Sequence, residues 1–305
     1  MFSELSTEFR GRKVVEFETS DSWEGPEVAY GLREGYDDED GTLVGKLAEL
    51  LKQPGSDQIT CLIVGAWGGV CEGDGSEKVV DAFVKVAEQL PMLRHLFFGE
   101  MTYEECEISW IKQCDLTPLL NAYPQLKSLR VRGGTSLSFS KTRHENLEEL
   151  AIESGGLSRS TLRDIFLCDF PKLEHLELML GEENYGFDGG VEDLQPLLSG
   201  KLFPKLKYMG LMNSAIANEI AAVVVNSPIV DRLETVDLSC GNLDEEGVKA
   251  LMGMASHKNL KQLIISHYYC NPVDVERLVR AMPFEVIAED RQEPEDEWRP
   301  ILHAE

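Results

Sequence analysis

An apolar triplet with the spacing L-x-x-L-x-L recurs along most of this chain, and this recurrence restricts the possible folds more than any other feature. Its clearest copy comprises Leu233, Val236 and Leu238, and the pattern restarts at Leu260, 27 positions later. The residues between these copies, Asp244–Ala255, have the apolar spacing of an amphipathic helix. A strand and a helix repeated at this period predict a solenoid, in which each unit buries its apolar face against its neighbours.

Eight triplets align along the sequence at intervals of 21 to 34 residues. They are Ile59/Leu62/Val64, Leu93/Leu96/Phe98, Leu126/Leu129/Val131, Leu147/Leu150/Ile152, Leu173/Leu176/Leu178, Leu206/Met209/Leu211, Leu233/Val236/Leu238 and Leu260/Leu263/Ile265. Helical spacing follows five of them, at Glu77–Leu90, Ser158–Phe170, Ala215–Val225, Asp244–Ala255 and Asn271–Met282. The interval between Leu126 and Leu147 leaves no room for a helix, so Ser136–Glu145 is predicted to be an extended connection.

A strand and a helix in units of about 27 residues resemble the leucine-rich repeats of ribonuclease-inhibitor-type proteins, here in a divergent form. The resemblance implies an α/β horseshoe with a parallel sheet on its concave side and a mostly helical convex side. It also implies Asn or Cys at the ninth repeat position, where this chain departs from the family. Glycine stands there in four units, at Gly134, Gly155, Gly181 and Gly241, which favours a turn with positive φ.

We expect one domain with capped ends, since a solenoid must cover its first and last exposed core edges. Residues 59–282 form the repeats, residues 1–58 an N-terminal cap with strands and a helix, and residues 283–305 a C-terminal cap and acidic tail. The acidic run Asp37–Asp40 is predicted to be a solvated turn rather than a metal loop. The composition near the C-terminus favours a flexible tail, with Trp298 and Ile301 tucking back as the less favoured alternative.

The formal net charge of −25 bears on partners rather than on fold. It argues against a nucleic-acid backbone or an anionic membrane surface, and it favours a basic protein partner if charge contributes to binding. The alternative is a soluble acidic surface of the bacterial type with no such meaning. No signal peptide or membrane span is visible, and the seven scattered cysteines indicate reduced thiols in the cytoplasm.

The residue types that carry catalysis or bind metals form no convincing constellation, so we expect neither an enzyme nor a cofactor. His95 and His175 share one column of the predicted sheet but stand three strand steps, or roughly 14 Å, apart, too far for one zinc ion. Glu149 lies between them and is expected to pair with His175. The glycine-rich Gly65–Gly75 carries acids and no Lys or Arg, which argues against phosphate binding.

The predicted concave face carries the first group of candidate partner-binding residues. Strand alternation sends the triplet residues into the core and their neighbours onto this face. Exposed aromatic and arginine side chains are typical of protein interfaces. The candidates are His95, Phe97, Arg130, Arg132, Glu149, His175, Glu177, Tyr208 and Met212. In the alternative interpretation these side chains pack on one another and bind nothing.

The second group lies where long units carry extra residues between strand and helix, at Ala66–Gly75, Glu100–Ile111 and Gly181–Gly190. Insertions in a solenoid map to one edge, often the binding edge. The candidates there are Trp67, Tyr103, Trp110, Tyr185 and, beyond the last strand, Tyr268. Aromatic residues among acids suit a basic protein or peptide, although the loops would equally cover their own edge of the core.

The function predicted from these features is protein–protein interaction, through the concave face and the edge loops. A regulator or inhibitor of an enzyme, such as a small GTPase or a nuclease, is the first alternative, but the Asn- and Arg-poor loops disfavour the GTPase version. A hydrolase with an unrecognised site is the second alternative. The sequence predicts no partner identity and no oligomeric state.

Overall fold

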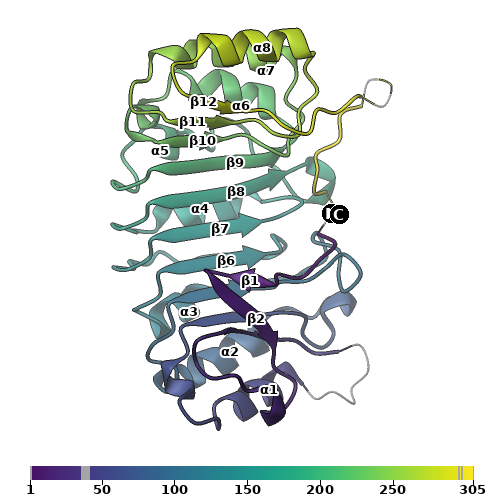
Figure 1. Cartoon of the computed structure of the whole chain (residues 1–305), viewed down its shortest axis with the longest axis vertical. Helices are drawn as coiled ribbons and strands as arrows, with labels where there is room; N and C mark the ends of the chain where they lie inside the picture. The colour runs from purple at the N-terminus through teal and green to yellow at the C-terminus, as the bar shows by residue number, and fades with distance from the viewer. Residues whose placement is uncertain (1, 36–41, 295, 297, 305) are drawn as a thin grey trace.

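The computed structural model describes residues 2–35, 42–294, 296 and 298–304, so the expected turn at Asp37–Asp40 lies outside the described residues. Within them, twelve strands form one sheet in sequence order, antiparallel only between β1 and β2 (Figure 1). The strands are β1 Glu8–Phe9, β2 Arg12–Glu16, β3 Ala29–Leu32, β4 Cys61–Val64, β5 His95–Phe98, β6 Ser128–Arg132, β7 Glu149–Glu153, β8 His175–Gly181, β9 Tyr208–Ser214, β10 Thr235–Asp237, β11 Gln262–Ile264 and β12 Glu285–Ile287.

The middle residues of all eight predicted triplets lie in register across this sheet, which confirms the α/β solenoid. They are, in order, Leu62, Leu96, Leu129, Leu150, Leu176, Met209, Val236 and Leu263. Each has an exposed fraction of 0%. Full burial of such a side chain stabilises the fold by about 1.5–3 kcal/mol, so the column is the main reason why the repeats stack.

Helices cover the opposite face of the sheet, with α2, α3 and α4 lying behind it in Figure 1. The helices of the described residues are α1 Leu43–Leu50, α2 Glu77–Lys85, α3 Thr117–Ala122, α4 Arg159–Leu167, α5 Gln195–Leu198, α6 Ala217–Val224, α7 Glu245–Leu251 and α8 Pro272–Ala281. Four begin at a side chain that accepts a backbone N–H, namely Thr42, Ser158, Asp244 and Asn271. None of the helices described has the length and hydropathy that crossing a membrane requires.

The shortest unit has no helix, as predicted. Residues 133–148 run through turns and isolated bridges, in which Thr135 and Ser138 pair in parallel with Lys112 and Asp115 of the preceding unit. These bridges extend the strand pairing beyond β6. A unit of this length therefore stays attached to its neighbour through backbone contacts.

The glycine column was expected to adopt positive φ, and for three of its four members this is wrong. Only Gly181 does so, with φ of 79°. Gly134, Gly155 and Gly241 are needed for space instead, since a Cβ at each would collide with neighbouring groups. The left-handed turn falls one position earlier in the repeat, where the residues with positive φ are Gly133, Asn213, Cys240 and His267.

Both chain ends fold back over the sheet, an arrangement that the repeat pattern does not predict. The β1–β2 hairpin crosses in front of the central strands, and the last residues approach it along the strand ends (Figure 1). The rings of Phe2 and His303 stack with centroids 4.2 Å apart. Ile301 is buried, as in the less favoured expectation that it tucks back, whereas Trp298 is 58% exposed; the flexible tail expected at residues 289–297 stays a prediction.

The burial of the seven cysteines yields a direct test of this packing. Cys71 is exposed, whereas the others are buried or half-buried, and none forms a disulfide. Burial raises the pKa of Cys240 and of Cys270 to about 12, which suppresses their reactive thiolate forms. We expect a thiol reagent such as DTNB to label one thiol rapidly in the native protein and seven after denaturation. Rapid labelling of three or more native thiols would contradict this packing.

Candidate interaction surface

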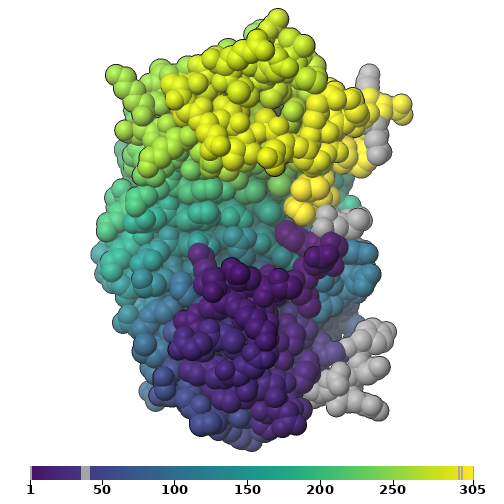
Figure 2. Space-filling view, viewed as in Figure 1, coloured from purple at the N-terminus to yellow at the C-terminus, as the bar shows by residue number. Residues whose placement is uncertain are grey.

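The predicted concave-face residues lie on one surface, but the chain covers part of it. Figure 2 shows the N-terminal part of the chain, in purple, over the lower half of this view and the C-terminal part, in yellow, over its upper half, with a teal and green band between them. The N-terminal hairpin buries Phe97, whose ring lies 6.1 Å from that of Phe9. Together with Ala29, Cys61 and Ile63 these two rings form a small apolar cluster separate from the main core. Phe97 is therefore inaccessible to a partner in this conformation.

The charged residues of the face neutralise one another. Arg130 donates to Glu153 at 2.6 Å and to Glu177 at 3.1 Å. Arg132 donates from Nε to the other oxygen of Glu153 at 2.6 Å, and its guanidinium lies 3.7 Å from the centre of the Phe2 ring. Arg132 and Glu153 are buried, so this pair is structural and Arg132 is not free to bind a partner.

Glu149 was expected to pair with His175, and this is wrong. Glu149 forms its ion pair with Arg10 of the N-terminal segment and lies 4.0 Å from Arg130. The Nε2 atom of His175 lies 3.2 Å from Glu177 instead. The difference arises because the hairpin brings a cation, Arg10, that strand alternation alone does not place on this face.

His175 and Tyr208 form the most accessible aromatic pair on the face. They occupy neighbouring strands, β8 and β9, and their rings stack 3.9 Å apart with an angle of 9° between the planes. The Tyr208 hydroxyl donates to Asp237 on β10 at 2.5 Å. Burial and then the charge of Asp237 raise the pKa of Tyr208, and burial also raises that of Asp237, so the hydroxyl stays protonated as a donor.

His95, Glu149, His175 and Tyr208 lie in register in one column, and each is half-buried. Met212, also half-buried, lies further along β9. These side chains and Arg130, which is also half-buried, are the part of the predicted face that stays partly accessible. Burial and the charge of nearby Arg10 lower the pKa of His95 to about 4, so this ring is neutral at pH 7.

The edge residues divide into buried and exposed groups. Trp67 is buried and donates its indole N–H to the Asp74 carbonyl at 3.1 Å, which folds that loop over its own edge. Tyr268 is also buried, and Tyr185 is half-buried. Trp110, 61% exposed, and Tyr103, 41% exposed, stay at the surface of one insertion. The edge candidates that present aromatic surface are therefore Tyr103 and Trp110.

Two side chains that matter on this surface were absent from the sequence prediction. Arg33, just after β3, contacts Glu16, Glu100 and Glu105 and ties the N-terminal region to the insertion that carries Trp110. Asn213 binds the backbone of the C-terminal segment. The eighth repeat position, which Asn213 occupies, could have drawn attention to this residue. The residue type at this position changes from unit to unit, however, so no pattern marked it.

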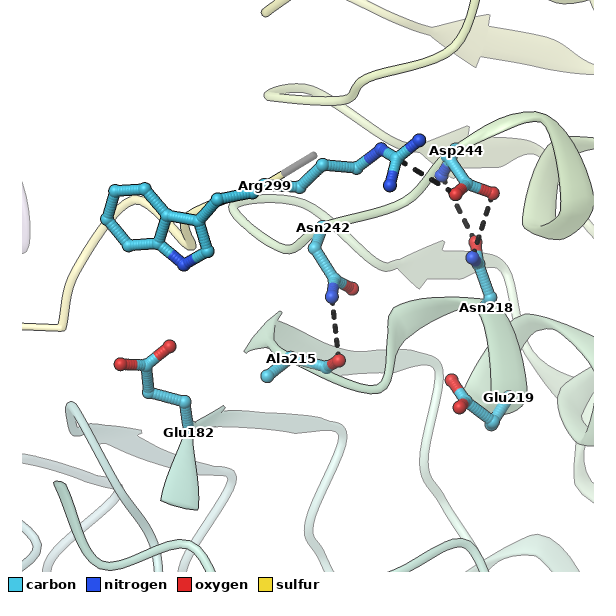
Figure 3. Close-up of a pocket in the computed structure, with 8 residues that line it drawn as sticks. Glu182, Ala215, Asn218, Glu219, Asn242, Asp244 and Arg299 are labelled. Atoms are coloured by element: carbon cyan, nitrogen blue, oxygen red, sulfur yellow. Dashed lines mark hydrogen bonds and ion pairs between the residues drawn. The ribbon is translucent and has the colours of Figure 1, made fainter. Parts of the chain in front are cut away.

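A polar cavity of about 360 Å³ opens at the strand-end edge near the C-terminal segment (Figure 3). It is lined by Glu182, Ala215, Asn218, Glu219, Asn242, Asp244, Trp298 and Arg299. Its two amides bond within the loops, since Asn218 donates to Asp244 at 2.8 Å and Asn242 donates to the Ala215 carbonyl at 2.7 Å. Arg299 lies 3.7 Å from Asp244. In the described part of the chain, no group of three or more His, Cys, Asp or Glu side chains is arranged to hold a metal ion.

Comparison with solved structures finds similar chains, two of which are described here. No protein-family model and no curated protein matches the chain. The crystal structure of a protein from Bacteroides fragilis superimposes with a TM-score of 0.82 and 34% sequence identity, covering 90% of this chain and 76% of that chain. The complex of TLR13 with ssRNA13 matches with a TM-score of 0.42 and 16% identity over 86% of this chain and 32% of that chain, too low to bear on fold or function.

Proposed function

The chain belongs to the same protein family as the Bacteroides fragilis protein. From its own surface we propose that it is a non-enzymatic module that binds a protein partner. The observation that carries the proposal is the band of strands between the two terminal segments, where the stacked His175 and Tyr208 remain partly accessible. A rigid aromatic pair on a regular sheet is the type of anchor that dominates protein interfaces. Met212 adds adaptable apolar surface beside it.

The same proposal extends to the strand-end edge. Tyr103 and Trp110 present aromatic surface there, and Glu104 beside them is exposed. Arg130 and Arg132 of the face are already paired with carboxylates, and the chain has 54 acidic against 29 Lys and Arg residues, a formal net charge of −25. This balance favours a partner with a basic surface, whose approach the field of the protein would accelerate.

Several finer features belong to the proposal as well. We assign the repeats to the ribonuclease-inhibitor type with a horseshoe curvature, because most units pair a strand with a helix. Residues 1–58 serve as the N-terminal cap, residues 59–282 as the repeats and residues 283–305 as the C-terminal cap. We place the protein in the cytoplasm, in agreement with seven free cysteines.

The test is affinity capture from a lysate of the source organism, with bound proteins identified by mass spectrometry. We expect Tyr208→Ala to reduce capture of the specific partner about tenfold or more, because the aromatic anchor is lost. Leu167→Ala is the matched control, since Leu167 is an exposed apolar residue on α4 of the opposite face and should leave capture unchanged. A partner captured equally by wild type and Tyr208→Ala, with both proteins folded by circular dichroism, would exclude the concave face.

Two further arms of the same experiment separate the edge from the face and test the role of charge. Trp110→Ala should weaken capture if the insertion loop contributes to binding. Elution in about 1 M salt, where the Debye length falls to about 3 Å, should release a basic partner. Retention at that salt concentration would remove the proposal that the partner is basic.

A further inference from the structure

The last residues that the structure describes, 300–304, lie across the strand ends as an extended segment, here called the C-terminal segment. One amide side chain holds both backbone groups of His303: the His303 N–H donates to Asn213 Oδ1 at 2.9 Å, and Asn213 Nδ2 donates to the His303 carbonyl at 2.6 Å. The Leu302 N–H donates to the Cys240 carbonyl at 2.9 Å. These bonds recognise main chain, so they are available to any extended peptide.

Side-chain contacts continue the same line toward β11. The Tyr269 hydroxyl donates to the Pro300 carbonyl at 2.6 Å, and His267 Nε2 lies 3.4 Å from the same oxygen. Ile301, between these anchors, is 5% exposed. The segment therefore combines a bonded proline carbonyl with a buried apolar side chain.

The residues that hold the segment share an unusual backbone conformation. Asn213, Cys240 and His267 occupy the eighth position of three consecutive repeats, and their φ values are 51°, 68° and 61°. Left-handed backbone is sparsely populated for residues other than glycine, and it persists where surrounding structure holds it, often at ligand contacts. Here each of the three residues contacts the C-terminal segment. The left-handed backbone conformation therefore recurs along one continuous line of contacts, which we call the strip.

The end of the C-terminal segment at His303 and Ala304 also packs closely against the rest of the protein. A Cβ at Gly155, whose φ is not positive, would collide with the carbonyl oxygen of Ala304. The His303 ring stacks on the Phe2 ring with centroids 4.2 Å apart and 7° between the planes. This stacking joins the two ends of the chain. Gly155 therefore supplies the space and Phe2 the aromatic surface for this end of the segment.

We propose that the strip formed by Asn213, Cys240, His267 and Tyr269 binds an extended segment of a protein partner, and that the C-terminal segment occupies it in the free protein. The contacts define the partner's chemistry: an extended main chain whose carbonyl meets Tyr269 and His267, an apolar residue directly after that carbonyl, and a flat ring two positions further on. This inference rests on the proposed function, because it names the ligand of one part of that surface. The tether gives the C-terminal segment a high effective concentration, so a partner must displace it.

Displacement would also change the neighbouring cavity. Trp298 and Arg299, which precede the C-terminal segment, form part of its lining (Figure 3). Release of the segment removes these two side chains and widens the opening toward Glu182, Glu219 and Asp244. The acidic lining would then face a basic residue of the partner at the position of Arg299, which lies 3.7 Å from Asp244 here.

The experiment uses the full chain and a fluorescein-labelled peptide of sequence WRPILHAE, residues 298–305. A release variant carries Ile301→Asp and Leu302→Pro, which removes the buried side chain and the N–H that bonds to Cys240. We expect fluorescence anisotropy to show peptide binding at least about tenfold tighter for this variant than for wild type, whose site is occupied. His303→Ala, which removes only the ring stacked on Phe2, is the milder release variant and should give a smaller gain.

Asn213→Gly in the release background should lose at least about tenfold in peptide affinity, since glycine tolerates the positive φ while lacking the amide. A control peptide with proline in place of leucine, WRPIPHAE, should bind as weakly. If both release variants unfold cooperatively on heating and neither binds the peptide, the proposal is overturned. A wild-type dimer in light scattering that dissociates on Leu302→Pro would also overturn it, because the occupant would then be a second copy.

Failure of this inference is distinguishable from failure of the proposed function. Partner capture that depends on Tyr208, together with no peptide binding by the release variants, would leave the concave-face proposal standing and remove the strip. Peptide binding by the release variants, together with partner capture that does not depend on Tyr208, would support the strip and remove the concave-face proposal.

Discussion

Replacement of Arg33 by methionine is expected to lower the free energy of unfolding by about 3–5 kcal/mol, because it removes one partner of a buried ionic cluster. The Arg33 side chain is 11% exposed and lies 2.8 Å from Glu16, 3.2 Å from Glu100 and 3.0 Å from Glu105. Burial alone would lower the pKa of the guanidinium, but the hydrogen bond and charge of Glu16, with the charges of Glu105 and Glu100, raise it. Methionine fills a similar volume without charge.

The large effect follows from what remains after the substitution. Glu100 is 1% exposed, and among the described residues the bond that its carboxylate keeps without Arg33 is the one donated by the Ser6 backbone N–H at 3.0 Å. A buried carboxylate without a cation is strongly unfavourable, whereas a neutral amide at the same place is tolerated. The double variant with Glu100→Gln should therefore recover part of the lost stability.

Urea unfolding at pH 7 and 25 °C provides the measurement. Lys13→Met is the matched control: Lys13 pairs with Glu24 at 2.9 Å, but the two side chains are 64% and 45% exposed, so the change should stay below about 1 kcal/mol. Equal effects for the arginine and the lysine would show that burial contributes nothing at Arg33. No recovery in the double variant would show that the arginine acts through packing rather than charge.

The repeat architecture was predictable from the sequence because its cause is periodic. Leu62, Leu96 and the other middle residues each face the same core, so one physical requirement recurs and is visible without coordinates. The helical spacing predicted at Asp244–Ala255 and Asn271–Met282 is likewise periodic, and the structure has helices there that begin at the capping side chains of Asp244 and Asn271. Alternation along each strand also placed Tyr208 and His175 correctly on one face.

The covering of that face by the chain ends was not predictable, because its cause is a set of single contacts. Arg10 meets Ser128, 118 positions away, and Asn213 meets His303, 90 positions away. Neither contact repeats, and neither segment has a hydrophobic period. The same holds for Arg33, whose sequence surroundings resemble any polar loop. Alternation indicates which way a side chain points, but it cannot indicate what lies above it.

These contacts change which candidates can meet a partner. Phe97, Arg132 and Trp67 contribute to stability in this conformation, whereas Tyr208, Met212 and Trp110 keep accessible surface. Strand alternation and the positions of the insertions predicted both sets of residues and did not distinguish between them. The site residues therefore remain predictions, now divided by burial into those that mutagenesis would destabilise and those that it would test for binding.

The second large effect is expected at Glu177, where Glu177→Gln should lower the free energy of unfolding by about 3 kcal/mol at pH 7. Burial alone would raise the pKa of this carboxyl, but hydrogen bonds from His175 and Arg130 and the charge of Arg130 lower it from its ordinary 4.5 to about 2. A depressed folded-state pKa stabilises the protein above the unfolded-state value, and the contribution disappears as the pH falls through the folded-state value. The window for Glu177 is therefore pH 4.5 to 2.

Urea unfolding of wild type and Glu177→Gln between pH 7 and pH 2.5 tests the sign as well as the size. The difference between the two proteins should stay constant above about pH 5 and shrink steadily below it, because the wild-type carboxylate becomes protonated in the unfolded state first. His303, whose pKa burial lowers to about 3, titrates in the same range but is common to both proteins and cancels in the difference. Glu174→Gln is the control, since its ion pair with Lys207 is exposed and should leave the free energy of unfolding nearly unchanged. A difference that persists unchanged to pH 2.5 would mean that Glu177 stabilises the sheet through neutral hydrogen bonds rather than through its charge.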